Sequence, residues 1–376
     1  MHLAYMARGA LKAGYDVHFF GGHALQKQVS HAFSAPHVTL TDHRQLPPFT
    51  DHTLVGQFRM FGDYLIRFIR TLFHLNKIKK EDAVYACSDM WFDVIPLLFC
   101  RARNKLMILG MDAPRLGEII RRSRPDVPAS RLASVHYSLS QGFALRAFRR
   151  CRRKKIFYVH PTMHGRLRSL GYKPAETVFI SNGVDVEMAD RIPGQSKRYD
   201  VIWIGRVHAQ KGIEEMLQTL VHLKDRVADF AAVLVGRLEA DLKPRIDELG
   251  LSPAVTFTGF VSDEEKLRLF KSSRLFIMPS HYESWGIVVG EALACGTPVV
   301  AYDLPAYRPI FGNLVDYVPC FDSEAFKKAA LRSLESARKD KVELDQSELQ
   351  TFRAMHSWQA AQRKFVEALE ELTGNG

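Results

Sequence analysis

The chain has 376 residues, more than the roughly 250–300 at which a single core stops growing, so two domains are expected. Its composition, 47% hydrophobic and 25% charged with 24 Gly and 17 Pro, excludes collagen-like, wholly disordered and coiled-coil proteins. The net charge of +11 is uneven, because residues 1–200 hold 31 Lys and Arg against 16 Asp and Glu. Residues 101–155 alone hold 15 against 3. This basic half predicts an anionic partner, which could be membrane phospholipid, nucleic acid or a charged polymer.

The apolar runs and the cysteines exclude further classes of protein. The longest apolar runs, such as Val94–Cys100, are far shorter than the ~20 residues that a membrane-spanning helix needs. The residues that follow Met1 do not form a signal peptide, so a cytoplasmic protein is expected. Five scattered cysteines without a CxxC pair predict neither a disulfide framework nor a zinc site, and are interpreted as core residues.

In the first half of the chain, short apolar runs alternate with helical patterns. Strands are predicted at 16–20, 37–40, 83–86, 106–109 and 156–159. Between the second and the third of these, residues 54–72 carry apolar side chains at helical spacing, which predicts an amphipathic helix.

A basic amphipathic helix is predicted over residues 143–155. One face would carry Phe143, Ala144, Ala147, Phe148 and Cys151, and most of the arginines would lie opposite. Such a helix can lie on an anionic membrane. The alternative is that its apolar face packs on the sheet of the first domain while the arginines are solvated. Nucleic-acid binding is disfavoured, because no aromatic stacking module accompanies the charge.

The second half alternates strands and helices more regularly. Strands are predicted at 200–204, 230–235, 255–260, 275–278 and 298–302. This alternation is typical of a parallel sheet with crossover helices, so the chain is predicted to contain two Rossmann-like domains in tandem. The boundary is placed within residues 181–197, where Asn182-Gly183 and Pro193-Gly194 favour turns.

The first candidate site follows the strand that ends at Ile204. The loop Gly205–Gly212 leads into a predicted helix, whose first amides could bind an anion. Gly205 would let the backbone approach a ligand, and Arg206 and Lys211 would supply cations for a diphosphate. The spacing is neither that of a Walker loop nor that of a dinucleotide fingerprint, so solvated surface charges remain the alternative.

The second candidate site follows the strand that ends at Met278. A helix is predicted over Gly286–Ala294, with Gly296 as its C-terminal stop. Glu283 then lies in the strand-to-helix loop, at the edge where open α/β sheets bind ligands, and Glu291 lies inside the helix. One carboxylate can face a substrate while the other braces it, or Glu291 can simply be solvated.

These residues resemble the E-x7-E motif of the family 4 retaining glycosyltransferases, which have the GT-B fold. The resemblance is specific over about residues 155–320 and looser before Tyr158. The matching segments are Ser181-Asn182-Gly183-Val184-Asp185, Gly205-Arg206, Lys211-Gly212, Val235-Gly236, Phe257-Thr258-Gly259-Phe260, and Pro279 to Val300 around Glu283 and Glu291.

The resemblance implies a role for each residue. Arg206 and Lys211 would hold the diphosphate of a nucleotide-sugar donor beside Gly205, together with the amides of Gly286 and Ile287. Glu283 would face the transferred sugar, and Glu291 would bind the nucleotide ribose. Because cations would replace a divalent metal at the leaving diphosphate, neither a metal nor another cofactor is expected.

The first domain departs from the family. Family members open with a strand and a glycine-rich loop before a helix like Met1–Gly14, and neither is found here. Either this start is too late or the chain is shortened, and the second case would leave an incomplete sheet. Asp112 resembles the aspartate of a His-Asp dipeptide that follows a strand in related enzymes, with Met111 in place of the histidine; it is the candidate catalytic residue of this domain, or a capping aspartate. His160 could be a cleft residue or a core histidine.

Together these predictions describe two Rossmann-like domains facing a cleft. Residues 1–180 would bind the acceptor, 181–350 the donor, and 351–376 would form a helix that crosses back to the first domain with Trp358 as its anchor. The implied reaction is retaining transfer of a sugar to a hydroxyl of an envelope glycan or glycolipid, on the inner face of the cell membrane. Alternatives are a nucleotide-sugar epimerase of the same architecture and a non-catalytic partner protein.

Overall fold

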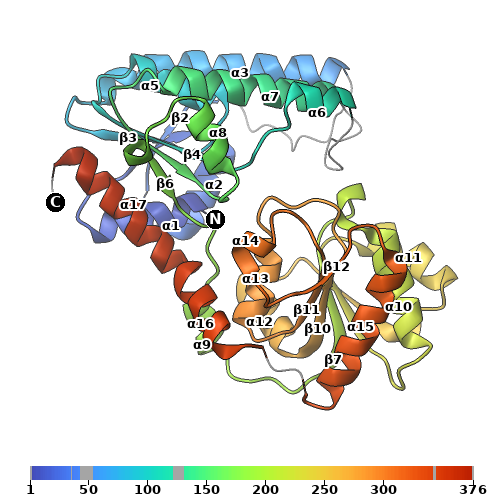
Figure 1. Ribbon diagram of the computed structural model, residues 1–376. Helices are drawn as coiled ribbons and strands as arrows, with labels where there is room; N and C mark the ends of the chain where they lie inside the picture. Colours follow the sequence, from blue (N-terminus) through green and yellow to red (C-terminus); the bar gives the residue numbers. More distant parts are fainter. Residues whose placement is uncertain (1, 35, 43–53, 122–130, 342–343, 375–376) are drawn as a thin grey trace. The chain divides into compact units, whose positions relative to one another are not determined.

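The computed structural model describes residues 2–34, 36–42, 54–121, 131–341 and 344–374 (Figure 1). The chain divides into two compact units, residues 1–181 with 359–376 and residues 182–358. The ladders between their strands are parallel, and helices alternate with the strands along the chain. The predicted α/β class is therefore confirmed.

The second unit contains one six-stranded sheet. Its strand order is β12-β11-β10-β7-β8-β9, so the direction of strand addition reverses between β7 and β10. The strands are β7 (Tyr199–Ile204), β8 (Ala232–Val235), β9 (Val255–Gly259), β10 (Ser273–Met278), β11 (Val299–Tyr302) and β12 (Asp316–Val318). The continuous apolar runs of β8, β10 and β11 are buried, as strands covered on both faces require.

Helices surround this sheet. They are α9 (Val186–Arg191), α10 (Ile213–Lys224), α11 (Glu239–Glu248), α12 (Asp263–Lys271), α13 (Ile287–Ala294), α14 (Arg308–Phe311), α15 (Ser323–Arg338) and α16 (Gln346–Met355), with short 3₁₀ turns at Ala209–Lys211 and Ser252–Ala254. Large aromatic side chains, among them Trp203, Trp285 and Tyr307, are fully buried in the core of this unit.

Among its described residues, the first unit contains two separate sheets. One pairs β1 (His18–Gly21) with β2 (His37–Leu40). The other has the order β3-β4-β5-β6 and consists of β3 (Ala83–Ala86), β4 (Asn104–Leu109), β5 (Arg153–Tyr158) and β6 (Thr177–Phe179).

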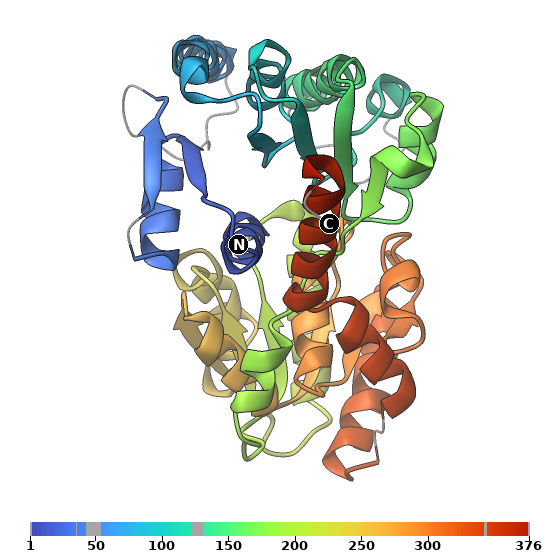
Figure 2. The ribbon, with the colours of Figure 1, turned by 90° about the vertical axis from the view of Figure 1, so that its left-hand side faces the viewer.

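The helices of the first unit include two long ones, α3 (Leu54–His74) and α7 (Arg131–Phe148), which run along one side of this unit (Figures 1 and 2). The others are α1 (His2–Lys12), α2 (His23–Ala32), α4 (Trp91–Val94), α5 (Pro96–Phe99), α6 (Leu116–Arg121), α8 (Met163–Ser169) and the C-terminal α17 (Trp358–Thr373), with 3₁₀ turns at Leu75–Lys77 and Pro174–Glu176. Within the described residues, no helix is both long and apolar enough to cross a membrane.

The predicted single helix over 351–376 is wrong, because this segment contains the end of one helix and the whole of another. α16 ends at Met355, and the chain then pairs with Val184, whose amide donates to the carbonyl of His356 at 2.8 Å. Trp358 is 2% exposed, and its ring fills the space that a side chain at Gly183 would need. From Gln359 onward α17 belongs to the first unit, where the Phe365 ring lies 5.2 Å from that of Tyr85.

The predicted basic helix over 143–155 is also wrong. α7 ends at Phe148 and β5 begins at Arg153. The apolar side chains of this segment, except Phe143, are buried in the first unit, so the packing alternative is the correct one for them. Lys154 is buried and forms a 2.7 Å ion pair with Glu176, while Lys155 pairs with Glu371.

Candidate active site

The two predicted loops of the second unit lie at one edge of its sheet. β7 and β10 are neighbouring parallel strands, so their carboxyl ends lead into residues 205–212 and 279–286 side by side. The strand order reverses between these same two strands. In an open parallel sheet, this reversal opens a crevice in which ligands bind.

Glycine allows the two loops to touch. Gly212 has φ +60°, and a Cβ at this position would overlap the carbonyl oxygen of Pro279. The amide of His281 donates to the carbonyl of Gln210 at 2.8 Å, which ties the loops together a second time. The His281 ring lies 2.7 Å from a carboxylate oxygen of Glu215, at the start of α10. Both loops are therefore held to the sheet edge as one structure.

Lys211 and Glu283 form an ion pair across these loops. Their Nζ and Oε1 atoms are 2.5 Å apart, and the side chains are only 15% and 13% exposed. The sequence predicted both residues at the site but not this contact between them. Arg206, in the same loop as Lys211, is exposed. The loop therefore carries one exposed cation, Arg206, and one cation that is paired with a carboxylate, Lys211.

Helix α13 begins directly after the second loop. Gly286 precedes it with φ +82°, and a Cβ there would meet the Tyr307 ring at 2.7 Å. Ile287 is the first helical residue, so its amide is among the donors that have no partner within the helix. These amides, with the positive end of the helix dipole, favour an anion at this end of the helix.

Glu291 lies inside α13 and is 7% exposed. Its Oε1 accepts from Lys266 of α12 at 2.8 Å, whereas its Oε2 has no hydrogen-bond partner among the described residues. Burial raises the pKa of Glu291, and Lys266 opposes this rise in part. Burial lowers the pKa of Lys266, but its ion pairs with Glu291 and Asp263 together outweigh burial, and the pKa is raised. A buried acceptor oxygen without a partner is costly, and a ligand hydroxyl would satisfy it.

Gly205 has a structural reason to be glycine. A Cβ at this position would meet the Trp203 ring at 2.6 Å, and a Cβ at Gly236 would overlap the carbonyl oxygen of Gly205. The Gly205 amide donates to Val235 at 3.1 Å. Close packing between the ends of β7 and β8 therefore accounts for this residue without a ligand.

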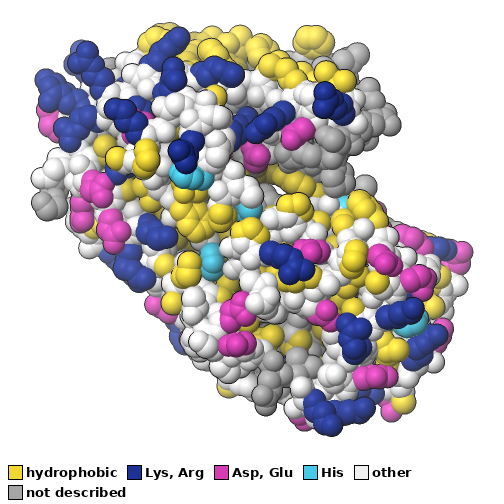
Figure 3. All heavy atoms as spheres, in the orientation of Figure 1, with side chains coloured by type: hydrophobic (Ala, Val, Ile, Leu, Met, Phe, Trp, Pro, Cys, Tyr) yellow, Lys and Arg dark blue, Asp and Glu magenta, His cyan; other side chains and the backbone are white. Residues whose placement is uncertain are grey.

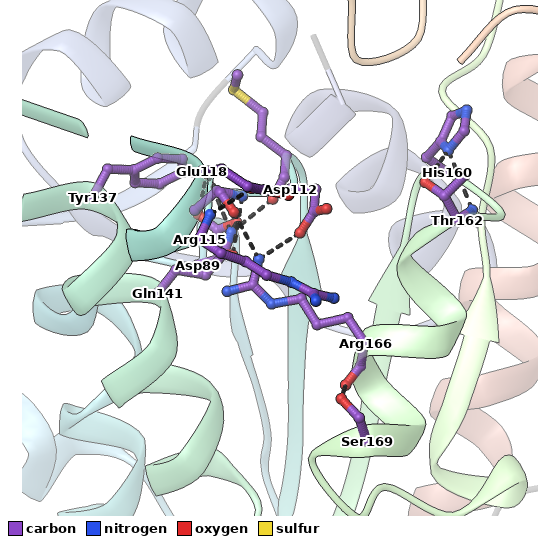
Figure 4. A network of polar contacts seen from close by, with 12 residues as sticks. Asp89, Asp112, Arg115, Glu118, Tyr137, Gln141, His160, Thr162, Arg166 and Ser169 are labelled. Carbon is purple, nitrogen blue, oxygen red and sulfur yellow. Dashed lines mark hydrogen bonds and ion pairs between the residues drawn. The ribbon is translucent and has the colours of Figure 1, made fainter. Parts of the chain in front are cut away.

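In the first unit, Asp112 follows β4 and forms an ion pair with Arg166 of α8 (Figure 4). Arg166 also donates to the carbonyl of Ala113 at 3.0 Å. Gln141 of α7 holds the same loop, since its Nε2 donates to Met111 at 2.6 Å and its Oε1 accepts from Ala113 at 3.2 Å. The loop that carries Asp112 is thus fixed from two helices.

Asp89 is a carboxylate that the sequence analysis missed. It is buried, its Oδ2 accepts from Gln141 at 2.8 Å, and burial raises its pKa. Nothing in the local sequence marks it, because its partners come from α7, about fifty positions further along the chain. His160 is 3% exposed and its Nδ1 lies 2.7 Å from Thr162 Oγ1, so the structure favours the core histidine (Figure 4).

Lys266 is the second residue that the sequence did not reveal. It lies in a run of charged residues that resembles an ordinary solvated helix start. Only the packing of α12 beside α13 brings its ammonium group to Glu291 and leaves it 14% exposed.

Part of the second unit is similar to a known protein family. Residues 187–347 match the family described as glycosyl transferases group 1. Phosphatidyl-myo-inositol mannosyltransferase of Mycobacterium leprae is 33% identical over 169 residues, which are 43% of this chain and 45% of that protein. The chain thus matches under half the length of the first curated relatives.

Solved structures are similar over nearly the whole chain. A glycosyltransferase from Rickettsia africae ESF-5 has a TM-score of 0.65 at 17% identity and covers 100% of this chain and 94% of its own. Anabaena Alr3699/HepE, solved in complex with UDP-glucose, has a TM-score of 0.67 at 16% identity and covers 98% and 95%. Such identities show the fold. Residues 187–347 are thus similar to the glycosyl transferases group 1, and the fold of the chain is GT-B.

Proposed function

We propose that the chain is a retaining, metal-independent hexosyltransferase, which moves a sugar from a nucleotide diphosphate sugar to a hydroxyl group. The observation that carries this proposal is the arrangement at the reversal point of the second sheet. There Lys211 is paired with Glu283, and the buried Glu291 offers an unpaired oxygen.

The reaction breaks the bond between the anomeric carbon and the β-phosphate oxygen, and forms a bond from that carbon to the acceptor oxygen. The acceptor proton leaves with the nucleoside diphosphate, on which negative charge develops. Arg206, Lys211 and the first amides of α13 are donors suited to stabilise this charge. In this proposal they fill the role of a divalent metal.

Glu283 and Glu291 have different tasks in this proposal. When a diphosphate takes Lys211, the carboxylate of Glu283 is released from its ion pair and can act on the transferred sugar. Glu291 keeps Lys266 on one oxygen and accepts a ribose hydroxyl on the other. The ribose would thereby satisfy the buried oxygen that has no partner in the protein.

The acceptor is proposed to be an envelope glycan or a glycolipid, made by a lipopolysaccharide or polysaccharide pathway at the inner face of the cell membrane. The name of the mycobacterial relative, which is a phosphatidyl-myo-inositol mannosyltransferase, supports a lipid-linked acceptor. The excess of basic residues in 1–200 supports an anionic membrane as partner. Asp112 is proposed as the acceptor-side catalytic residue, positioned by Arg166.

A donor screen tests the proposal. The protein is incubated with UDP-, GDP- and ADP-hexoses and a membrane glycolipid extract, and nucleoside diphosphate release and the anomeric configuration of the product are measured. We expect release of the nucleoside diphosphate from one donor class and retention of the anomeric configuration in the product. EDTA should not reduce the activity, and Glu283→Ala should abolish most of the turnover. Loss of activity in EDTA that Mn²⁺ restores would contradict metal independence. Inversion would exclude the retaining mechanism.

Two outcomes would favour the alternatives. Epimerisation of the sugar without transfer would indicate a nucleotide-sugar epimerase. Binding of a nucleoside diphosphate without turnover of any donor would indicate a non-catalytic partner protein. Undetectable binding of UDP, GDP and ADP at millimolar concentration would overturn the donor site itself.

A further inference from the structure

Helix α3 presents an apolar face away from the core of the first unit. At 100° per residue its exposed apolar side chains fall on one stripe, and two of them, Phe58 and Phe73, are each 76% exposed. The stripe consists of Phe58, Phe61, Leu65, Ile66, Ile69 and Phe73. The side of α3 next to this stripe is apolar too, since Tyr64 stacks on Phe92 at 4.1 Å and Phe68 lies 5.3 Å from Trp91.

Two neighbouring helices extend this stripe. α5 packs against both α3 and α7, and its last residue, Phe99, is 65% exposed. The Phe61 ring also lies 6.3 Å from His136 of α7, and Leu139 and Phe143 follow His136 at helical spacing as further exposed residues. Yellow side chains accordingly follow α3 along the top of Figure 3. We call the stripe together with Phe99, Leu139 and Phe143 the apolar face.

Cations follow the apolar residues on all three helices. Phe73 is followed by Lys77, Lys79 and Lys80, Phe99 by Arg101 and Arg103, and Phe143 by Arg146, Arg149 and Arg150, all of them exposed. Arg146 and Arg149 donate to carbonyl oxygens, which are uncharged, so these contacts do not neutralise their charge.

Four of these cations surround a hollow of about 500 Å³. Its lining consists of Asn76, Ile78, Lys79, Lys80, Arg101 and Arg103 and contains no acidic residue. The amide of Arg103 donates to the carbonyl of Lys80 at 3.1 Å, which joins the segment after α3 to the segment after α5. We call this the basic hollow. It begins three residues after Phe73 and two after Phe99, so it adjoins the apolar face along both segments.

We propose that the apolar face and the basic hollow together form a docking surface for an anionic phospholipid membrane. Aromatic and aliphatic side chains would enter the boundary between headgroups and acyl chains, and the basic hollow would receive a lipid phosphate. A second copy of the chain fits less well, because two such surfaces placed face to face would bring like charges together. The earlier candidate, a helix over 143–155, is replaced by this surface.

The inference deepens the proposed function and rests on its membrane partner, and because docking is measured without donor or acceptor, its failure is distinguishable from failure of sugar transfer. Co-sedimentation with phosphatidylcholine vesicles, with and without phosphatidylglycerol, is the test. We expect binding of the full chain to the anionic vesicles only, weakened at ~0.5 M salt, where the Debye length is a few ångströms. Equal binding to neutral vesicles, or no binding to either kind, would overturn the proposal.

Paired variants separate the two parts of the surface. Phe58→Ser with Phe73→Ser should weaken vesicle affinity by at least about tenfold, because two aromatic side chains no longer leave water. Phe260→Ser is the matched control, since Phe260 of the second unit is 80% exposed and lies outside the apolar face. Both variants should keep the far-ultraviolet circular dichroism of the parent. A loss of vesicle affinity no larger than that of Phe260→Ser would show that the apolar face does not contribute to membrane binding.

The charges are tested in the same way. Lys79→Gln with Arg101→Gln should weaken binding to anionic vesicles by roughly thirtyfold, from about 1 kcal/mol per basic residue near the surface. Lys243→Gln with Lys328→Gln removes two exposed lysines of the second unit and should leave binding unchanged. Equal losses of vesicle affinity in the two double variants would mean that only the net charge of the protein matters, and would contradict binding of a lipid phosphate in the basic hollow.

Sedimentation equilibrium tests the alternative occupant of the apolar face. If the parent did not bind vesicles but formed a dimer, and Phe58→Ser with Phe73→Ser dissociated that dimer, the apolar face would be assigned to a second copy of the chain.

Discussion

Two carboxylates of the second unit, only eight positions apart in the sequence, lie on different elements and have different partners. Glu283 shares a 2.5 Å ion pair with Lys211 in a loop, and Glu291 shares a 2.8 Å pair with Lys266 inside the fold. In the proposed function, the first pair exchanges partners when the diphosphate arrives. Opening the second pair would leave the buried Glu291 without its cation, so Lys266 is the fixed partner in this proposal.

The Lys211–Glu283 pair predicts opposite effects of two substitutions on nucleoside diphosphate binding. Glu283→Gln removes the carboxylate that competes for Lys211, so affinity for the diphosphate should rise by severalfold. Lys211→Met removes a charge-assisted hydrogen bond and should weaken binding by about 1.5–3 kcal/mol. Isothermal titration calorimetry with UDP, GDP and ADP measures both. If both variants lose affinity equally, the pair does not compete with the ligand.

The Lys266–Glu291 pair predicts a pH-dependent loss of stability. Lys266→Met leaves a buried carboxylate unpaired, which should cost about 3–5 kcal/mol of unfolding free energy when that carboxylate is ionised. The pKa of Glu291, already raised by burial, should rise further. The folded state then binds more protons than the unfolded state, so stability should fall as the pH rises from 5 to 8.

Urea unfolding of Lys266→Met at both pH values is the measurement. Lys266→Met combined with Glu291→Gln is the control, because it removes the ionisable group and should remove the pH dependence that Glu291 adds. If Lys266→Met had the same stability at pH 5 and pH 8, Glu291 would remain ionised without its partner, and the account of the pair would be wrong.

At the scale of elements, the apolar strands of the second unit could be predicted from sequence because burial on both faces leaves continuous apolar runs. β6 and β12 were missed because each has only three residues and is partly exposed. The helix predicted over 143–155 was wrong because the turn at 149–152 contains neither Gly nor Pro. The two loops were predicted from their motifs, but the partners of Glu283, Glu291 and Asp112 depend on tertiary packing that spacing does not encode.

The contact between the two loops predicts a strong effect of one methyl group. Gly212→Ala must place a Cβ against the carbonyl of Pro279 at φ +60°, so it should destabilise the second unit and weaken nucleoside diphosphate binding. Gly250→Ala is a matched control, since Gly250 has φ +65° but its nearest neighbour is the tip of Lys224, at 3.7 Å. The control should lose only about 1–2 kcal/mol, the cost of a left-handed L-residue.

Urea unfolding and calorimetric titration of both glycine variants separate the cost of the left-handed backbone from the cost of the clash with the Pro279 carbonyl. A loss in Gly212→Ala equal to that in Gly250→Ala would mean that the Pro279 carbonyl moves aside freely. The loops would then not be held together closely enough to pre-form the site.

At the scale of the whole molecule, the chain consists of two units with separate cores, and the proposed donor-binding residues all belong to residues 182–358. A ligand that binds only the folded form of one unit stabilises that unit by RT ln(1 + [L]/Kd), which is about 2.7 kcal/mol at a hundredfold excess over Kd.

Differential scanning calorimetry of the full chain should therefore show two transitions, and the preferred nucleoside diphosphate should raise the midpoint temperature of one of them. Arg206→Ala should reduce this shift without moving either transition in the absence of ligand, because Arg206 is exposed. A single transition that the ligand raises would mean that the two units unfold as one. If it raised neither while transfer was observed, the donor would bind outside the site described by Lys211, Glu283 and Glu291.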